Sequence, residues 1–270
     1  MRELRAAALE ALLLADPDAR CAAVAQLAAI TEVDPDRTPV ANGAVPARPD
    51  RPRLVAARNL PARGAHSPEG RAALLHALAH IEFNAIALAL DAVWRFGAMP
   101  RDYYIDWRSV ALDEARHFGL LCQHLATLGH AYGDFDAHDA LWEMAERTAH
   151  DLLDRMALVP RTLEARGLDA SPRVRTALAA AGDDLAAGIV DVILADEIRH
   201  VAIGTRWFQW LCSGRGLDPV AAQAEIERRY RLSPVRGPAN VAARRAAGFS
   251  ETEIRRLQDL IADPRQMMPD

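Results

Sequence analysis

Two five-residue stretches of this chain are nearly identical. Asp-Glu-Ala-Arg-His occupies residues 113–117, and Asp-Glu-Ile-Arg-His occupies residues 196–200. Each stretch lies in an apolar pattern with helical spacing, and in each the Glu precedes the His by three residues. Because three residues are close to one helical turn, the two side chains leave the helix on the same side. The chain must therefore contain two long helices that present the same pair of groups.

These paired side chains suit a metal centre. Glu114 and His117, like Glu197 and His200, fall within the apolar stripes of their helices, where an unpaired charge is expensive. Two inward Glu-x-x-His pairs, with one further Glu from each of two other helices, form dinuclear iron or manganese sites in four-helix bundles. The sequence predicts such a site if two more helices with carboxylates exist.

The composition narrows the class of protein. The 270 residues are 51% hydrophobic and only 6% aromatic, with many Ala and Leu, which favours an all-α fold. The absence of lysine excludes Schiff-base chemistry and a phosphate-loop lysine. The net charge of −5 argues against nucleic acid as a partner. Cys21, Cys122 and Cys212 are too scattered for a disulfide framework or a structural zinc site.

No targeting or membrane segment is expected. The N-terminal Ala/Leu run contains Glu10, and no segment reaches about 18 consecutive apolar residues. We therefore expect a cytoplasmic protein without a membrane partner.

Prolines divide the chain into parts. Residues 3–30 predict short amphipathic helices around Asp16-Pro17-Asp18, and six prolines between positions 35 and 61 rule out long elements there. The predicted parts are N-terminal helices with a Pro-rich arm (1–66), a four-helix bundle (67–214) and a C-terminal helical appendage (215–270).

Four long helical patterns follow Ser67. They cover residues 68–97, 101–128, 138–166 and 183–212. Pro160 should kink the third helix, and Gly167 and Ser171-Pro172 should end it before a short helix at 172–181. Further helices are expected near 218–230 and after Ser250, where Glu253 completes a capping-box spacing, with an irregular stretch through Pro234 and a Pro/Met tail.

The remaining carboxylates come from the helix spacing. Glu82 lies on the buried face of the first helix, 32 residues before Glu114. A duplicated helical hairpin places the counterpart about 32 residues before Glu197, where Glu164 occurs. Glu143 and Glu146 are the alternatives, but they lie at least 18 residues upstream of Glu164, about 27 Å along a continuous helix.

The predicted site combines four carboxylates and two imidazoles. Its metal ligands are Glu82, Glu114, His117, Glu164, Glu197 and His200. Asp113 and Asp196 are predicted to orient the imidazoles, with Arg116 and Arg199 balancing their charge. No catalytic residue is expected beyond these ligands. The other helical histidines, including His80 and His124, receive no role, and Arg244-Arg245 and Arg255-Arg256 are expected to be solvated.

With these residues identified, the chain resembles the ferritin-like superfamily of di-iron carboxylate proteins. The Asp-Glu-x-Arg-His stretches match the motif of its oxygenase and ribonucleotide-reductase small-subunit branches. Residues 68–215, including His80-Ile81-Glu82 and Leu141-Trp142-Glu143-Met144-Ala145, look like an uncharacterised bacterial ferritin-like family, a domain of unknown function. Glu164-Ala165-Arg166 is also similar to the third-helix motif of the di-iron tRNA hydroxylase that modifies isopentenyladenosine derivatives.

The expected function is a non-haem di-iron oxidase or hydroxylase that activates O₂ and acts on a small organic substrate. Two iron ions are the expected cofactor, with manganese or a mixed pair as alternatives. A separate reductase or ferredoxin would deliver electrons, and a small homo-oligomer is expected. The alternative function is iron binding or ferroxidase activity without an organic substrate. A third hypothesis is a metal-free bundle used for protein interaction.

Overall fold

The computed structural model describes residues 2–61, 64–232 and 237–263. Its regular elements are helices, and the described residues contain two isolated β-bridges but no strand. The predicted all-α class is therefore confirmed. The chain divides into two compact units: unit 1 comprises Met1–Glu143 with Ala177–Ile189, and unit 2 comprises Met144–Thr176 with Val190–Asp270. The division predicted at residues 66 and 214 stays a prediction.

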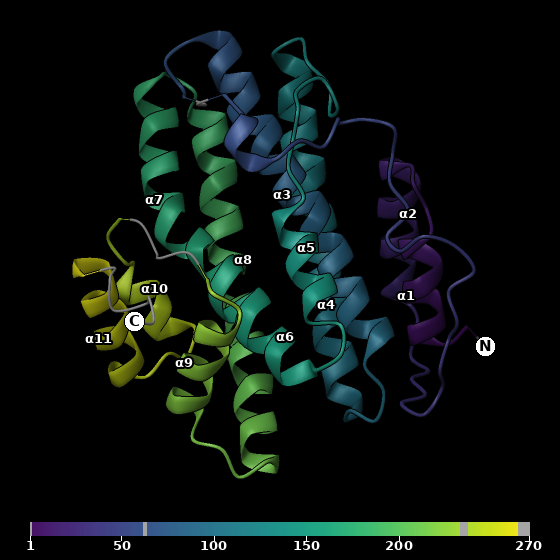
Figure 1. Cartoon of the computed structure of the whole chain (residues 1–270). Coiled ribbons are helices and arrows are strands. Elements are labelled where there is room, and N and C mark those ends of the chain that lie inside the picture. Colours follow the sequence, from purple (N-terminus) through teal and green to yellow (C-terminus); the bar gives the residue numbers. More distant parts are fainter. Residues whose placement is uncertain (1, 62–63, 233–236, 264–270) are drawn as a thin grey trace. The chain divides into compact units, whose positions relative to one another are not determined.

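Unit 1 is built on two long antiparallel helices. They are α3 (Pro68–Arg95) and α4 (Arg101–Thr127), which pack along each other (Figure 1). Their bounds match the predicted helices within two residues. The short helix α1 (Leu4–Leu12) packs on α3, and α2 (Pro17–Leu27) packs on α4. The side chains of Glu3, Asp16 and Ser67 accept hydrogen bonds from backbone N–H groups of the first helical turns, which explains where these helices begin.

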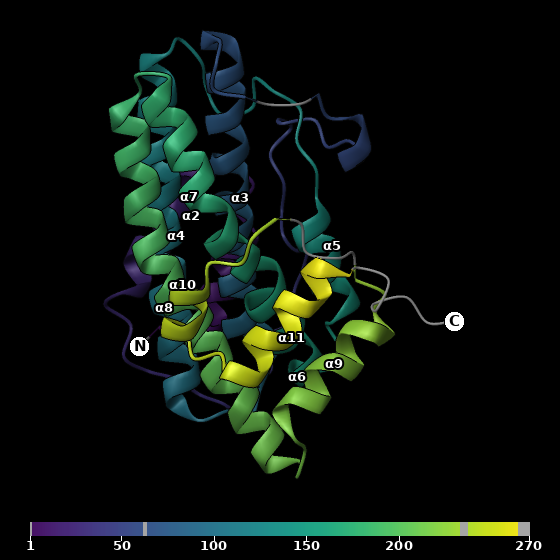
Figure 2. The same ribbon diagram turned by 90° about the vertical axis from the view of Figure 1, so that its left-hand side faces the viewer.

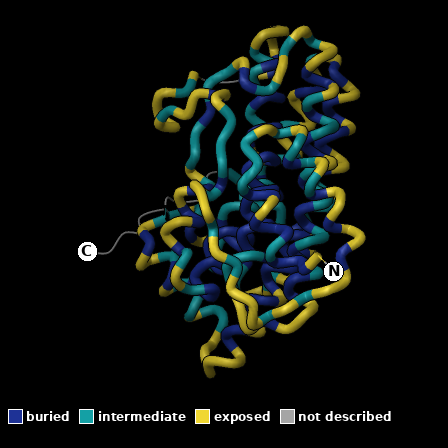
Figure 3. The backbone as a smooth tube through the Cα atoms, turned by 90° about the vertical axis from the view of Figure 1, so that its right-hand side faces the viewer, coloured by how far each residue is buried: buried dark blue, intermediate teal, exposed yellow. Residues whose placement is uncertain are grey.

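Helix α3 is the most deeply buried element of unit 1. Every residue from Glu82 to Val93 is buried, so this part of the helix is covered on all sides; buried backbone is dark blue in Figure 3. By length and mean hydropathy alone α3 could cross a membrane, although it has no run of about 18 consecutive apolar residues. Its most apolar 18-residue window is 72% buried within the protein, as in the core helix of a soluble fold.

Hydrogen bonds join the Pro-rich segment to other parts of unit 1. Its only described helix is the three-residue η1 (Ala57–Asn59), which agrees with the prediction of no long element. Arg5 donates to the Pro35 carbonyl at 2.8 Å, and the Trp94 indole donates to the Pro39 carbonyl at 2.8 Å. Further along, the N–H of Val55 donates to the Ala137 carbonyl at 2.8 Å. These hydrogen bonds hold the segment against the helices and the loop of unit 1 that it contacts.

Unit 2 contains the C-terminal helices and the segments that lead to them. Figure 2 shows α9 and α11 side by side. Its elements are α6 (Leu152–Leu158), η2 (Val159–Glu164), α9 (Pro219–Arg229), α10 (Val241–Ala246) and α11 (Glu251–Ala262). Three helices have residues in both units: α5 (Ala140–Arg147), α7 (Ala165–Ala180) and α8 (Asp184–Gly214).

The predicted third long helix, 138–166, is wrong as a single element. The chain forms α5, α6 and η2 over this range. Pro160 causes a local change as expected, because η2 is a π-helical turn that contains it. The predicted break at Ser171-Pro172 does not occur, since α7 runs through Pro172.

A side chain replaces the hydrogen bond that Pro172 removes from α7. Proline lacks an N–H, so the carbonyl four residues earlier, that of Leu168, loses its helical donor. The Asn240 amide donates to this carbonyl at 3.2 Å. The Asn240 N–H also donates to Asp169 at 2.7 Å. Because this donor comes from a segment about 70 residues later, local sequence patterns cannot reveal it.

The C-terminal appendage matches the prediction in part. Helices α9 and α11 occur as predicted, and Ser250 with Glu253 forms the predicted capping box. Helix α10 was not predicted. Pro234 and the Pro/Met tail lie outside the described residues.

The core of unit 2 joins α7, α8 and α10. Ala165, Leu168 and Val201 pack with Ala243 and Ala247. Arg244, predicted to be solvated, is 4% exposed and ion-paired with Asp169 at 2.6 Å. The short apolar residues around it leave room for the long side chain, which explains the error.

Candidate metal centre

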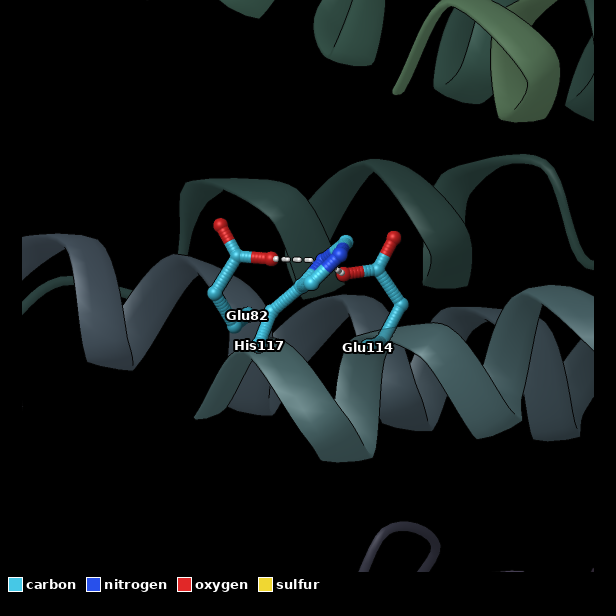
Figure 4. Close-up of side chains that lie close together, drawn as sticks. All are labelled: Glu82, Glu114 and His117. Carbon is cyan, nitrogen blue, oxygen red and sulfur yellow. Dashed lines mark hydrogen bonds and ion pairs between the residues drawn. The ribbon is translucent and has the colours of Figure 1, made fainter. Parts of the chain in front are cut away.

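Three of the predicted ligands converge in unit 1. Glu82 extends from α3, and Glu114 and His117 extend from α4, one helical turn apart (Figure 4). The His117 Nδ1 atom lies 3.2 Å from Oε2 of Glu82 and 3.3 Å from Oε2 of Glu114. All three residues are buried, with exposed fractions of 5% or less. The α3–α4 pairing therefore brings together residues that are 32 or more positions apart in sequence.

The cluster is electrostatically strained without a cation. Burial raises the pKa of Glu82 well above its usual value, and the neighbouring Glu114 charge adds to this effect. Burial alone would lower the pKa of His117, but its hydrogen bonds and attraction to Glu114 and Glu82 raise it to about 10. The His117 imidazole thus interacts with two buried carboxylates at once.

The same atoms fit a divalent metal ion. The candidate ligand atoms of Glu82, Glu114 and His117 all lie within 4.8 Å of one another. Two carboxylate oxygens and one imidazole nitrogen are a donor set that iron, manganese and zinc accept. A divalent cation would offset both carboxylate charges and remove the need for a proton on His117.

An aromatic residue follows one ligand on each of the two helices α3 and α4. Phe83 follows Glu82 on α3, Phe118 follows His117 on α4, and their ring centroids are 5.2 Å apart. Tyr132 packs on Phe118 at 5.0 Å, and its hydroxyl lies 2.9 Å from Nδ1 of His80. The contact between Phe83 and Phe118 joins α3 to α4 one residue away from Glu82 and His117.

The other three predicted ligands belong to unit 2. Glu197 and His200 lie one turn apart on α8, with His200 Nδ1 3.1 Å from Oε2 of Glu197. His200 is fully buried, and Glu164 is the partly buried last residue of η2.

The residues predicted to support the ligands lie beside them on the same helices. Arg116 and Asp113 on α4 form an ion pair with 3.8 Å between Nη2 and Oδ1. Asp196 is partly buried on α8, and Arg199 on the same helix is exposed. Their predicted role in orienting the imidazoles stays a prediction.

Comparison with known proteins places the chain in a family. Residues 13–255 match the family described as "Protein of unknown function (DUF455)". The chain belongs to this family. It is 49% identical over 217 residues to an uncharacterized protein of Haemophilus influenzae, and the match covers 78% of this chain and 75% of the relative. No solved structure matches. The resemblance to a family of unknown function is therefore confirmed.

Some buried polar groups of this DUF455 protein were not found from the sequence. His124 lies 2.9 Å from Asp183, and Arg71 lies 3.4 Å from the same carboxylate. In unit 2, Arg161 is 2% exposed and contacts Gln223 and Glu253. Single Arg and His residues on amphipathic helices carry no spacing signal, because their partners come from distant segments.

Proposed function

We propose that this protein is a ferritin-like four-helix bundle with a dinuclear metal centre, and that it is a non-haem di-iron oxidase or hydroxylase. One observation carries the proposal: two carboxylates and an imidazole are buried within 4.8 Å of one another in unit 1. Buried acids in this number are expensive unless a cation compensates them. The proposed substrate is a small organic molecule, oxidised with O₂.

The duplicated motif supports two metal ions instead of one. Glu82, Glu114 and His117 form one set, and Glu164, Glu197 and His200 repeat the same residue types at nearly the same spacing. We propose that the second set supplies the remaining ligands. Four carboxylate charges then balance two divalent ions. Manganese, or one iron with one manganese, fits the same donors.

The chain itself would bind and shield the centre. When bound, a pair of redox-active ions supplies the electrons and open coordination positions that O₂ activation requires. Glu82 and Glu114 provide negative charge and flexible oxygen donors, while His117 provides a neutral nitrogen. Glu82, Glu114 and His117 are all buried, so little water reaches them, which strengthens the electrostatic interactions among them. An external reductase or ferredoxin is proposed as the electron source.

The experiment that tests this function combines reconstitution and turnover. Protein loaded anaerobically with Fe²⁺ is mixed with O₂ and a chemical reductant, and O₂ uptake is recorded with and without a panel of small organic compounds. The proposal predicts uptake that is catalytic in protein and rises with one class of compound. It also predicts loss of that uptake in the double variant Glu114→Gln, Glu197→Gln.

The control is Glu225→Gln, which changes an exposed acid with a side chain that is 50% exposed. It should retain wild-type uptake. Uptake that stops after the bound Fe²⁺ is oxidised, with further Fe²⁺ restoring it, would replace the oxygenase proposal by ferroxidase activity. No uptake and no iron binding would contradict both.

A further inference from the structure

Two cysteines of unit 1 lie on helices that pack against each other. Cys21 is on α2 and Cys122 is on α4. Both side chains are partly buried, and both thiols are free. The guanidinium of Arg20, next to Cys21, lies 4.5 Å from the ring centroid of Phe83. Phe83 packs on Phe118, one helical turn before Cys122, with 5.2 Å between the ring centroids. Contacts with one ring therefore join the surroundings of the two cysteines.

The charges that act on Cys122 also come from α2. Burial raises the pKa of Cys122, and the charges of Cys21 and Asp18 raise it further. Cys21 and Asp18 are one helical turn apart, so the face of α2 that carries them is the face near Cys122. The fold thus brings together two thiols that are far apart in the sequence.

Within the described part of the chain, Arg20 is a buried cation that no carboxylate pairs with. It is only 1% exposed. Its guanidinium donates to the carbonyl oxygens of Leu14 and Ala47 and covers the ring of Phe83. Because a buried cation is costly without a counter-charge, an anionic group beside Arg20 would be stabilised. The titratable groups whose charges act on Arg20 are Tyr132, Arg48 and Cys21.

Two thiolates suit a soft monovalent metal ion. Thiolate sulfur selects Cu⁺ over harder ions. Zinc, another ion that thiolates bind, takes four ligands in structural sites. Among the described residues, no cluster of three or more metal-binding groups includes a cysteine. An ion that two sulfur ligands satisfy therefore fits Cys21 and Cys122 better than zinc does.

The charges of a Cu⁺ complex at this place would balance. Two thiolates contribute two negative charges and Cu⁺ contributes one positive charge, which leaves one negative charge for the Arg20 guanidinium to offset. The two thiol protons pass to solvent when the ion binds. The ion stays Cu⁺, so no electron is transferred and no oxidant is needed.

We propose that Cys21 and Cys122 bind one Cu⁺ ion as two thiolates, with Arg20 offsetting the negative charge of the complex. None of the six residues predicted to bind iron takes part. The copper site is therefore separate from the proposed dinuclear centre, and it can be filled while that centre is empty. A bound ion would also join α2 to α4.

The test uses the full chain, reduced and treated with a chelator that removes iron. Cu⁺ is kept reduced with ascorbate under argon and titrated in competition with the coloured ligand bicinchoninate. The protein should withdraw about one Cu⁺ per chain, and about two fewer thiols should then react with a thiol reagent. Zn²⁺ at the same concentration should leave the thiols reactive. A protein that withdraws no Cu⁺ from bicinchoninate would overturn the proposal.

Variants at the cysteines and the arginine locate the ion. Cys21→Ala and Cys122→Ala should each abolish the withdrawal of Cu⁺, because only one thiolate remains. Cys212→Ala, which removes the buried thiol of α8, is the matched control and should bind as wild type. Arg20→Gln should weaken Cu⁺ binding by roughly 10- to 100-fold, as for other groups that support metal ligands.

Three results would contradict this site. Wild-type Cu⁺ binding by Cys21→Ala or by Cys122→Ala would show that the two thiols do not act together. An equal loss in Cys212→Ala would show that the ion binds elsewhere. Wild-type binding by Arg20→Gln, with its helical circular dichroism retained, would show that Arg20 does not offset the charge of the complex.

Discussion

The His117 imidazole on α4 lies 3.2 Å from the carboxylate of Glu82 on α3, and both side chains are buried. This contact joins a residue of the duplicated motif to a carboxylate that was predicted from its place on the apolar face of another helix. It also explains the unusual electrostatics of the cluster, because the same imidazole faces Glu114. The arrangement suits a cation better than it suits two carboxylates and a proton.

The cluster predicts a small cost for removing one carboxylate charge. Glu82→Gln keeps the shape of the side chain and relieves the repulsion by Glu114 that raises the pKa of Glu82. The free energy of unfolding of the metal-free variant should lie within about 1 kcal/mol of wild type in urea denaturation at pH 7. A loss of several kcal/mol would show that the carboxylate is needed mainly for folding.

The contact between α8 and η2 predicts that Gly204 cannot be enlarged. A Cβ atom at Gly204 would lie 2.4 Å from Cβ of Pro160. Gly204→Ala should therefore lower the free energy of unfolding by about 1–3 kcal/mol. On the same helix, a Cβ atom at Gly188 would meet no described atom within 4 Å. Gly188→Ala should instead gain up to about 1 kcal/mol. Equal effects of the two substitutions would contradict the contact.

The hydrogen bond from Asn240 to Leu168 predicts coupling with Pro172. Asn240→Ala should cost about 1–2 kcal/mol, because Asn240 also caps α10 by accepting from the Ala243 N–H. In a Pro172→Ala background the alanine N–H can donate to Leu168, so the cost should fall by about 0.5–1 kcal/mol. A double-mutant cycle by chemical denaturation measures this difference. Strict additivity would show that the Asn240 bond does not replace the missing one.

The lack of lysine predicts an unusual alkaline stability profile. Between pH 9 and 12 the Cys and Tyr side chains titrate, and burial also lowers the pKa of Arg20 into this range, to about 10. Burial raises the pKa of Cys122 to about 12, from an ordinary value of 9.0. Burial likewise raises the pKa of Cys21 to about 11 and that of Tyr230 to about 12. The folded state thus keeps protons that the unfolded state loses, so stability is complete below pH 9 and falls as the pH rises.

Urea midpoints at pH 8 and pH 10.5 test this profile. Cys122→Ala should reduce the loss between the two pH values by on the order of 1 kcal/mol, whatever its effect at pH 8. Tyr103→Phe, which changes a buried tyrosine and leaves the three cysteines in place, serves as a comparison. An unchanged pH dependence in Cys122→Ala would show that this thiol does not contribute.

Strong periodic signals were sufficient for α3, α4 and α8. Each has a long apolar stripe, and Ser67, Gly97 and Pro100 mark two of their ends in the sequence. The capping-box spacing of Ser250 and Glu253 located the start of α11. The apolar face of the first long helix also selected Glu82, which the α3–α4 packing brings to Glu114 and His117.

The predictions that were wrong concern residues whose partners lie far away in the sequence. The signals at Ser171-Pro172 predict a helix end, but Asn240 supplies the missing donor from a later segment. In the sequence, Arg244 looks like a surface residue. In the structure it is ion-paired with Asp169 of α7 and is buried. Such contacts depend on tertiary packing, which overrides local propensity. The six-ligand centre as a whole stays a proposal.

The most direct test of the central claim is the metal content of the protein after loading with Fe²⁺ and removal of unbound ions, measured by elemental analysis. With the proposed dinuclear centre, the wild-type chain should retain about two metal ions. The Glu82→Gln variant should retain at most one ion, and the double variant Glu114→Gln, Glu197→Gln should retain almost none. Wild-type protein that retains no metal, or variants that retain as much as wild type, would contradict the proposed centre.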